Sequence, residues 1–251
     1  MFDHYSFQLV ALFVIGILAG FINTVAGGGS FLTLPLLIFM GLPTSVANGT
    51  NRLGIFLQSL AGVSKFHDHG VFPWRFALIV SIPAVAGALL GAHWAVDMGD
   101  EVFRRWLALF MVIMTFVSLY KPKGTFIVSD EGYSPLRWAA IIIAFFVIGL
   151  YGGFIQAGVG FLLLAGMALT GHDLIRGNAI KVFVVLVFTV FALGIFIYNG
   201  KIDYGLGIVL GLGNAIGARF GANASVKGGN VFIRRFVTVM MLVFAVKLLW
   251  G

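Results

Sequence analysis

The chain has 251 residues, of which 60% are hydrophobic and 10% are charged. An ordinary soluble domain has roughly 45–50% apolar and about 25% charged residues, so this composition excludes a soluble globular protein. At about 20 residues per crossing, the apolar sequence has room for about eight to ten membrane segments. The composition therefore predicts an all-α, polytopic membrane protein without a separate soluble domain.

The net charge of +7 comes from 16 Lys and Arg against 9 Asp and Glu. Most of the basic residues lie in short loops between apolar segments and form no basic stripe of the kind that binds nucleic acid. We interpret them as topology signals and expect membrane lipid, not nucleic acid, around the chain. The opening residues 1–6 carry no Lys or Arg, unlike a secretory signal peptide, so the first segment is expected to stay in the mature protein.

Apolar segments occur in two similar series along the chain. The first series covers 7–26, 28–40, 46–66, 76–96 and 103–120, and the second covers 136–156, 158–170, 178–198, 204–222 and 231–249. A polar stretch separates them. We therefore expect a first membrane repeat at 1–120, an inter-repeat loop at 121–135 and a second membrane repeat at 136–251.

The two series are similar in sequence as well as in spacing. A shift of 130 residues brings residues of the first series onto identical residues of the second, as with Gly41, Asn48, Gly87 and Gly91 onto Gly171, Asn178, Gly217 and Gly221. The alternative is a chance overlap of two glycine-rich apolar stretches. A duplicated membrane unit is typical of transporters whose binding site lies between the two halves.

The two short segments, 28–40 and 158–170, decide how the repeats are related. Counting them as crossings gives five per half and inverted repeats, whereas omitting them gives four per half and parallel repeats. The five-segment count places more Lys and Arg on one side of the membrane, which favours inversion with both termini outside. A run of 13 residues covers only about 20 Å as a helix, so we expect half-helices or re-entrant hairpins near the bilayer midplane.

Each short segment begins at a glycine-rich break. Successive glycines are unfavourable inside a helix, and a break within a membrane leaves backbone groups that must line a cavity or meet a ligand. The amino terminus of the next half-helix carries partial positive charge, which favours an anion. The alternative is that these glycines only allow close helix packing. The residues of the two breaks expected to bind the ligand are Asn23, Gly27, Gly28, Gly29, Ser30, Gln156, Gly158 and Gly160.

A second polar cluster follows each half-helix, in the opening turns of a long apolar helix. Each cluster includes a cation, and a cation at bilayer depth usually faces a cavity or a partner. The alternative is that these cations extend to the lipid headgroups. Arg219, inside a later apolar segment, is either a ligand contact or another such headgroup-facing residue. The resulting candidates are Asn48, Thr50, Asn51, Arg52, Asn178, Lys181 and Arg219.

The acidic residues all lie in loops or at segment ends. Cation transport generally needs carboxylates at depth, so a cationic substrate is disfavoured. The chain has no Cys and lacks the nucleotide-binding, nucleophile and zinc-peptidase patterns. We therefore predict no enzyme activity, no cofactor and no metal site.

The motifs together resemble those of the TauE/SafE family of sulfite and organosulfonate exporters. The residues that carry the resemblance are Gly16-x-x-Ala19-Gly20, Ala26-Gly27-Gly28-Gly29-Ser30, Leu34-Pro35-Leu36-Leu37, Gly41 and Ala47-Asn48-Gly49-Thr50-Asn51, with a degenerate copy at Gly152-Gly153, Gly158-Val159-Gly160, Gly171 and Asn178-Ala179-Ile180-Lys181. The resemblance implies a multi-pass carrier in the cell membrane that moves small sulfur-containing anions such as sulfite, sulfonates or thiosulfate. The second copy has Val159 where the first has its middle glycine, so the two half-sites are not expected to contribute equally.

The hypothesis from sequence is an alternating-access transporter of a small anion, with its site at the repeat interface. The main alternative is a membrane scaffold or assembly partner without transport, which would have unbroken helices and no central polar cavity. The sequence leaves open the identity of the anion, the direction of flux, the coupling ion and whether the chain forms a homo-oligomer.

Overall fold

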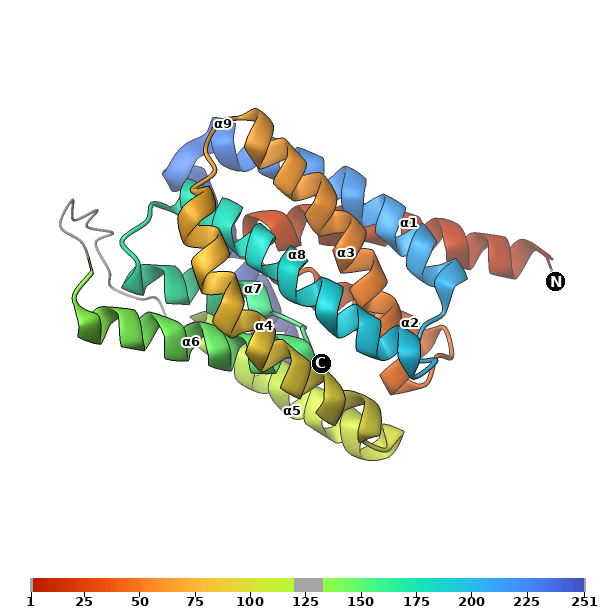
Figure 1. The fold of residues 1–251 in the computed structure, drawn as a ribbon. Coiled ribbons are helices and arrows are strands. Elements are labelled where there is room, and N and C mark those ends of the chain that lie inside the picture. Colours follow the sequence, from red (N-terminus) through yellow and green to blue (C-terminus); the bar gives the residue numbers. More distant parts are fainter. Residues whose placement is uncertain (1, 120–132, 251) are drawn as a thin grey trace.

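The computed structural model describes residues 2–119 and 133–250, and these ranges contain helices and no strands (Figure 1). The predicted first repeat contains α1 (Phe2–Val25), α2 (Ser30–Phe39), α3 (Thr44–Asp68), α4 (Trp74–Asp97) and α5 (Asp100–Leu119). The second comprises α6 (Pro135–Phe154), α7 (Val159–Gly166) with a 3-10 turn (Met167–Leu169), α8 (Leu174–Tyr198) and α9 (Tyr204–Trp250). Most of the predicted inter-repeat loop lies outside the described residues.

The predicted series of segments is confirmed. Its last two members are joined in α9, which leaves helical geometry at Gly229, where φ is 67° and ψ is −171°. Local signals set several of the helix starts. Asp173 accepts hydrogen bonds from the backbone N–H groups of Ile175 and Arg176 at the start of α8. Ser134 does the same for Arg137 before α6.

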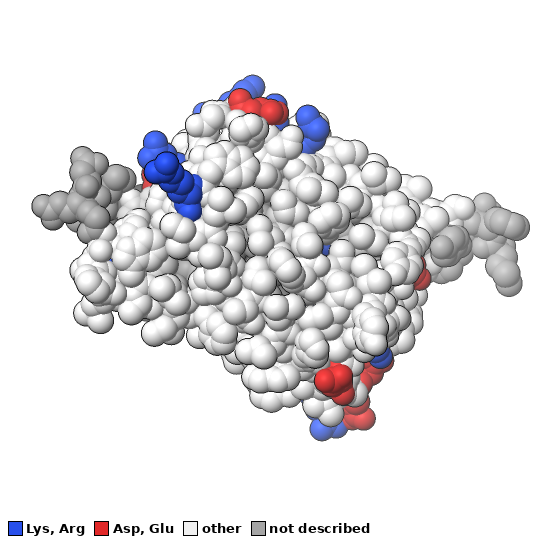
Figure 2. Space-filling model, viewed as in Figure 1, with Lys and Arg blue, Asp and Glu red and all other residues white. Residues whose placement is uncertain are grey.

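The helices suit a membrane by length and composition. Within the described residues, five are long and apolar enough to cross one, at Ser6–Val25, Trp74–Asp97, Pro135–Phe154, Leu174–Tyr198 and Tyr204–Ile233. Large apolar side chains face outward, including Ile82, Ile143 and Phe220 at 71%, 63% and 61% exposure. Figure 2 shows a broad uncharged belt between charged groups at opposite ends of this face. This belt is the surface that lipid would cover, so the chain is a multi-pass membrane protein.

Helices of the two repeats pack against each other in pairs across the interface. The most extensive helix pairs include α1 with α9 and α4 with α6, so the first helix of each repeat packs on the fourth of the other. Small residues make both contacts close. Gly87 and Gly91 of α4 lie against the backbone of α6, and the repeat-related Gly217 and Gly221 of α9 lie against that of α1. The shared glycine pattern therefore has the same packing role in both halves.

Matching helices of the two repeats run in opposite directions. In Figure 1, α1 runs from right to left and α6 from left to right, and α3 and α8 also run in opposite directions. Helices α3 and α8 pack together, between the pairs formed by α1 with α9 and by α4 with α6. This arrangement supports the inverted relation of the repeats, which remains a prediction.

Candidate functional site

Both predicted breaks are present. Helix α1 ends at Val25 and α2 begins at Ser30, while α6 ends at Phe154 and α7 begins at Val159. Among the described residues, Gln156 is the non-glycine residue with positive φ, at 66°. Such strained backbone costs of order 1–3 kcal/mol and persists where the surrounding structure holds it, often at functional sites. The breaks therefore leave two short half-helices inside the protein.

The first break touches the start of α7, where Gly27 meets Gly160. A Cβ atom built on either glycine would lie less than 3.0 Å from the backbone of the other, closer than real Cβ atoms come. Gly27 also has a φ of 103°, which disfavours other residues. Glycine at these positions allows the interrupted helices of the two repeats to meet backbone to backbone.

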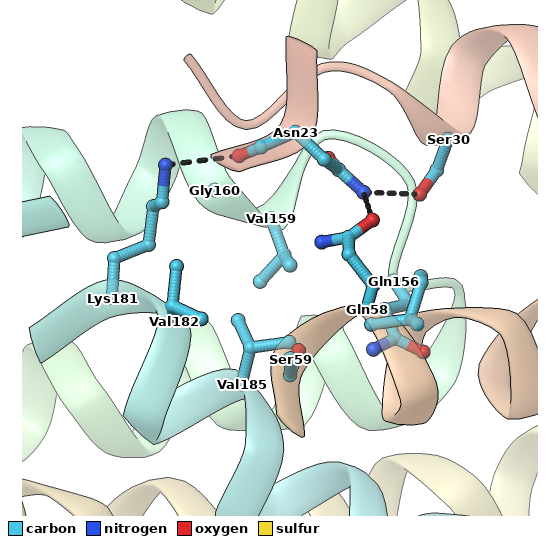
Figure 3. A pocket seen from close by; sticks show the side chains of 11 residues that line it. Asn23, Ser30, Gln58, Ser59, Gln156, Val159, Gly160, Lys181, Val182 and Val185 are labelled. Atoms are coloured by element: carbon cyan, nitrogen blue, oxygen red, sulfur yellow. Dashed lines mark hydrogen bonds between the residues drawn. The ribbon is translucent and has the colours of Figure 1, made fainter. Parts of the chain in front are cut away.

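A small pocket lies beside this contact (Figure 3). Its polar lining comes from the helix ends on either side of the first break, from the second break, and from α3 and α8. The volume open to the centre of a water molecule is about 20 Å³, room for about one water. The lining residues are Asn23, Ser30, Gln58, Ser59, Gln156 and Lys181, together with Ile55, Val159, Gly160, Val182 and Val185.

A chain of hydrogen bonds orients the amides at this pocket. The Gly29 N–H donates to Oδ1 of Asn23 at 3.0 Å, so Nδ2 of Asn23 is the donor toward Oε1 of Gln58 at 3.1 Å. The same Nδ2 lies 3.5 Å from the Ser30 hydroxyl. Because Oε1 of Gln58 accepts from Asn23, its Nε2 is left to face the pocket, and Figure 3 shows it pointing toward Val159. Asn23, beside the first break, thus orients the Gln58 amide of α3 as a donor toward the pocket.

Two further polar atoms of the lining have no partner within the protein. The Ser59 hydroxyl and Oε1 of Gln156 are buried and make no hydrogen bond, although Nε2 of Gln156 donates to the Thr189 hydroxyl at 2.8 Å. A buried polar group without a partner costs about 1–3 kcal/mol. Because both atoms lie on the pocket wall, a bound molecule or water can supply the missing hydrogen bonds.

The broken end of α1 is closed by side chains from the second repeat. The last four carbonyls of a helix lack partners within the helix. At this end the returning chain bonds the Ile22 carbonyl. Nζ of Lys181 donates to the carbonyls of Asn23 at 3.0 Å and Thr24 at 2.7 Å, and Nδ2 of Asn178 donates to that of Val25 at 3.1 Å. All four carbonyls are therefore satisfied.

The broken end of α6 is closed in the same way by the first repeat. The returning chain bonds the Tyr151 carbonyl. The Arg52 guanidinium donates to the next two carbonyls, those of Gly152 at 3.0 Å and Gly153 at 2.5 Å, and Nδ2 of Asn48 donates to that of Phe154 at 2.9 Å. A cation also opposes the partial negative charge at a helix carboxyl terminus. One cation and one asparagine of each repeat thus close the interrupted helix of the other.

These contacts revise what was expected of the two cations. Arg52 is 0% exposed and Lys181 is 1% exposed, so the alternative that both extend to headgroups is wrong. Lys181 also lines the pocket, but Arg52 does not. The Arg52 guanidinium instead lies 4.6 Å from the ring centroid of Phe196. The two cations are related in structural role but not in access to the pocket.

The other sequence candidates fall into two groups. Gly28 and Gly29 lie within the first break and Gly158 in the second, without lining the pocket. Away from the breaks, Thr50 accepts from the Asp203 N–H at 2.9 Å, and Oδ1 of Asn51 accepts from the Thr33 hydroxyl at 2.6 Å.

Arg219 corrects the sequence-based prediction, because the structure does not bring it to the pocket. It is exposed on α9, in the helix pair with α1. The sequence left two readings of Arg219, a ligand contact or a residue that faces the headgroups, and its exposure agrees with the second. Segment position alone does not specify which face of a helix a residue occupies.

Gln58 and Ser59 line the pocket but were not among the sequence candidates. Their signal was present in the sequence, since both are polar and lie later on the same helix as Arg52. The residues of the second half that a shift of 130 matches to them are Phe188 and Thr189. Because Gln58 matches a phenylalanine, the similarity of the two halves does not single it out.

Comparisons with known proteins agree with these observations. The model of the family described as "Sulfite exporter TauE/SafE" matches residues 12–248. A relative from Sinorhizobium, "Probable membrane transporter protein ORF9", is 28% identical over 97% of this chain and 94% of its own length. "Probable membrane transporter protein YfcA" of Escherichia coli K12 is 27% identical over 96% of this chain and 90% of its own.

No solved structure matches the chain. The family match extends over both repeats, both breaks and the residues that close them. The chain belongs to the TauE/SafE family of membrane transporters.

Proposed function

We propose that this transporter carries small sulfur-containing anions, of the sulfite, sulfonate or thiosulfate type, through the pocket between the repeats. The observation that carries the proposal is the convergence of Lys181, the Gln58 amide and the unpartnered Ser59 hydroxyl at one pocket. These groups donate hydrogen bonds to the oxygens of an anion. The family description names sulfite export, which agrees with this chemistry.

The surroundings of the pocket also favour an anion. No Asp or Glu is among its lining residues. The half-helices α2 and α7 begin at Ser30 and Val159, both on the pocket wall, and their amino termini carry partial positive charge. A cation would find no carboxylate to replace its hydration shell there.

Transport through this site requires the pocket to open. A volume that admits about one water is too small for a sulfonate, so the described state is a closed one in the proposed cycle. The substrate would enter when the elements around the pocket separate toward one side and leave when they separate toward the other. We place this activity in the cell membrane.

A scaffold without transport is the alternative, and the structure favours it less. A scaffold has no need of two breaks or of buried polar atoms left unpartnered at a pocket. No catalytic constellation was found in the sequence that would favour an enzyme.

Uptake by purified protein in liposomes tests the proposal. Sulfite, sulfoacetate, taurine and thiosulfate are offered separately, with protein-free liposomes as the control. We expect flux of at least one of the anions. Absence of anion flux together with flux of a cation would refute the proposal.

Chemical labelling tests the location of the pathway, since the chain has no cysteine. Ser59→Cys places a thiol on the pocket wall and Ser225→Cys places one at a buried position on α9 that does not line the pocket. We expect a small thiol reagent to label the first faster than the second in a transporting protein, and substrate to slow that labelling. Equal, substrate-independent rates would favour the scaffold.

A further inference from the structure

Two phenylalanines occupy matching places in the two repeats, one toward each end of the pocket. A shift of 130 residues brings Phe66 of α3 onto Phe196 of α8, and it brings Ile55 of the pocket wall onto Val185 of the same wall. We infer that Phe66 and Phe196 are the two gates of the transport path, each closing the pocket toward a different face of the membrane. This inference rests on the proposed function, because it states how the same pocket is opened and closed.

The register of α3 and α8 places the two rings at opposite ends of the pocket. The helices run in opposite directions and pack together (Figure 1). A Cβ atom on Gly49 would lie 2.8 Å from the Phe196 ring, and one on Gly62 would lie 2.9 Å from Val182. The pocket residues of α3 lie between these two levels, and Phe66 lies about one turn beyond Gly62. The pocket is therefore between Phe196 at one end of the helix pair and Phe66 at the other.

Both rings lie on the face of their helix that lines the pocket. Each follows a pocket-lining residue by 11 positions, Phe66 after Ile55 and Phe196 after Val185. That spacing is about three helical turns, so the later side chain points in nearly the same direction about 17 Å further along. Both rings are 0% exposed although each lies near the end of its helix. A path that leaves the pocket along α3 and α8 therefore meets one ring in each direction.

Phe66 closes its end of the pocket with small and apolar side chains. Its buried neighbours in one cluster are Ala179, Val182 and Ala222. Val182 also lines the pocket, so this cluster is continuous with the pocket wall. Val71, from the connection between α3 and α4, packs against the cluster and is partly exposed. The cluster thus lies between the pocket and the surface, and an apolar constriction of this kind excludes water and ions until the helices separate.

Phe196 closes the other end with Arg52 and the connection between α8 and α9. The Arg52 guanidinium lies 4.6 Å from the centroid of the ring and also holds the end of α6, which ties this gate to the second break. The connection covers the start of α3, where the Asp203 N–H donates to the Thr50 hydroxyl at 2.9 Å. A shift of 130 matches Arg52 to Val182. The two ends are thus built alike, although one is apolar and the other contains a cation–π contact.

Labelling from each face of the membrane tests the two gates. The protein carries Ser59→Cys, which places its one thiol on the pocket wall. A membrane-impermeant thiol reagent is added to intact cells or to inverted membrane vesicles, which expose opposite faces. Replacing a buried phenylalanine by alanine removes more packing than an about tenfold change in the open population requires. We expect Phe66→Ala to raise the labelling rate by at least about tenfold from one face, and Phe196→Ala to do so from the other.

Phe103→Ala is the matched control. Phe103 is equally buried, but it lies on α5, none of whose described residues lines the pocket. A cavity opened there should leave labelling unchanged from both faces. Phe66→Leu and Phe196→Leu remove less volume and disturb folding less. Each should give a smaller increase from the same face as its alanine variant, so the test stands even where an alanine variant fails to fold.

The outcomes separate this inference from the function on which it rests. Increases from opposite faces in the variants of Phe66 and Phe196, without an increase in Phe103→Ala, support the two gates. Increases from the same face, from both faces at once or from neither would overturn the inference, and anion flux through the unmodified protein would still stand. Absence of that flux would overturn the proposed function and, with it, the role of the two rings in transport.

Discussion

The contact between Gly27 and Gly160 gives a quantitative test of how the two breaks are held together. Replacing Gly27 by Ala has two costs: the alanine must adopt a φ of 103°, and its Cβ must displace the backbone of Gly160. The left-handed conformation costs about 1–2 kcal/mol. Insertion of a methyl group into a packed region costs about 1–3 kcal/mol more.

Gly41 separates the two terms. Its φ is 96°, close to that of Gly27, but a Cβ there would meet nothing within 4 Å. Gly41→Ala therefore carries the conformational cost alone, and the change in unfolded-state entropy is the same for both substitutions. We expect Gly27→Ala to destabilise the protein by about 1–3 kcal/mol more than Gly41→Ala.

Gly160→Ala measures the contact from the other side. Gly160 lies in α7 without positive φ, so its replacement carries the packing cost without the left-handed strain. The assay is thermal or denaturant unfolding of purified protein in one detergent, with flux measured in parallel. Equal stability of Gly27→Ala and Gly41→Ala, or a neutral effect of Gly160→Ala, would refute the close approach of the two breaks.

Three further predictions concern the residues that close the broken helices and the exposed cation. Arg52→Met should lower the free energy of unfolding by at least about 2 kcal/mol, since two buried carbonyls lose their donors. Arg52→Lys should recover part of the loss, because an ammonium can still reach one or both carbonyls. Equal unfolding midpoints for the two variants would argue against this role of Arg52. Asn48→Ala and Asn178→Ala should each cost about 1–3 kcal/mol, because each leaves the last carbonyl of a helix unpaired; a large effect in one and none in the other, by the same measurement, would contradict the shared arrangement. Arg219→Gln should change stability by no more than about 0.5 kcal/mol and leave substrate flux unaltered, as expected for an exposed position; loss of flux in liposomes would restore Arg219 as a ligand contact.

The pairing of cations with helix ends explains why such residues occur at depth in the protein. Interrupting a helix inside a membrane exposes carbonyls that water cannot reach, and each is costly unless it finds a donor. Arg52 and Lys181 each supply two donors from one group, and an asparagine supplies the third. The chain thereby keeps two half-helices beside a pocket without leaving the last carbonyls of α1 and α6 unpaired.

The segments and breaks could be predicted because their causes are local. A run of apolar residues must become a helix in lipid, since no other backbone hydrogen-bond partners are available there. A sequence such as Gly27-Gly28-Gly29 opposes helix formation wherever it occurs. The duplication could be recognised because both halves need small residues where helices pack closely. Gly87 and Gly217 are such residues at matching positions.

The partners of the buried polar residues could not be predicted in this way. Lys181 lies more than 150 positions from the carbonyls that it bonds. Nothing near it in the chain specifies that it closes α1. Gln58 acquires its direction from Asn23 on another helix. Arg219 lies within an apolar segment of the sequence, but its side chain is exposed in the fold.

The sequence by itself determined a helical membrane protein in two related halves, each with an interrupted segment, because hydropathy and glycine act on the residues around them. Only the tertiary structure decided which cation reaches the pocket, which closes a helix end, and which α3 side chains face the cavity. Those outcomes depend on which faces of distant helices come together. The physical reason is that hydrogen bonding between buried groups is a property of the packed repeats and not of either one alone.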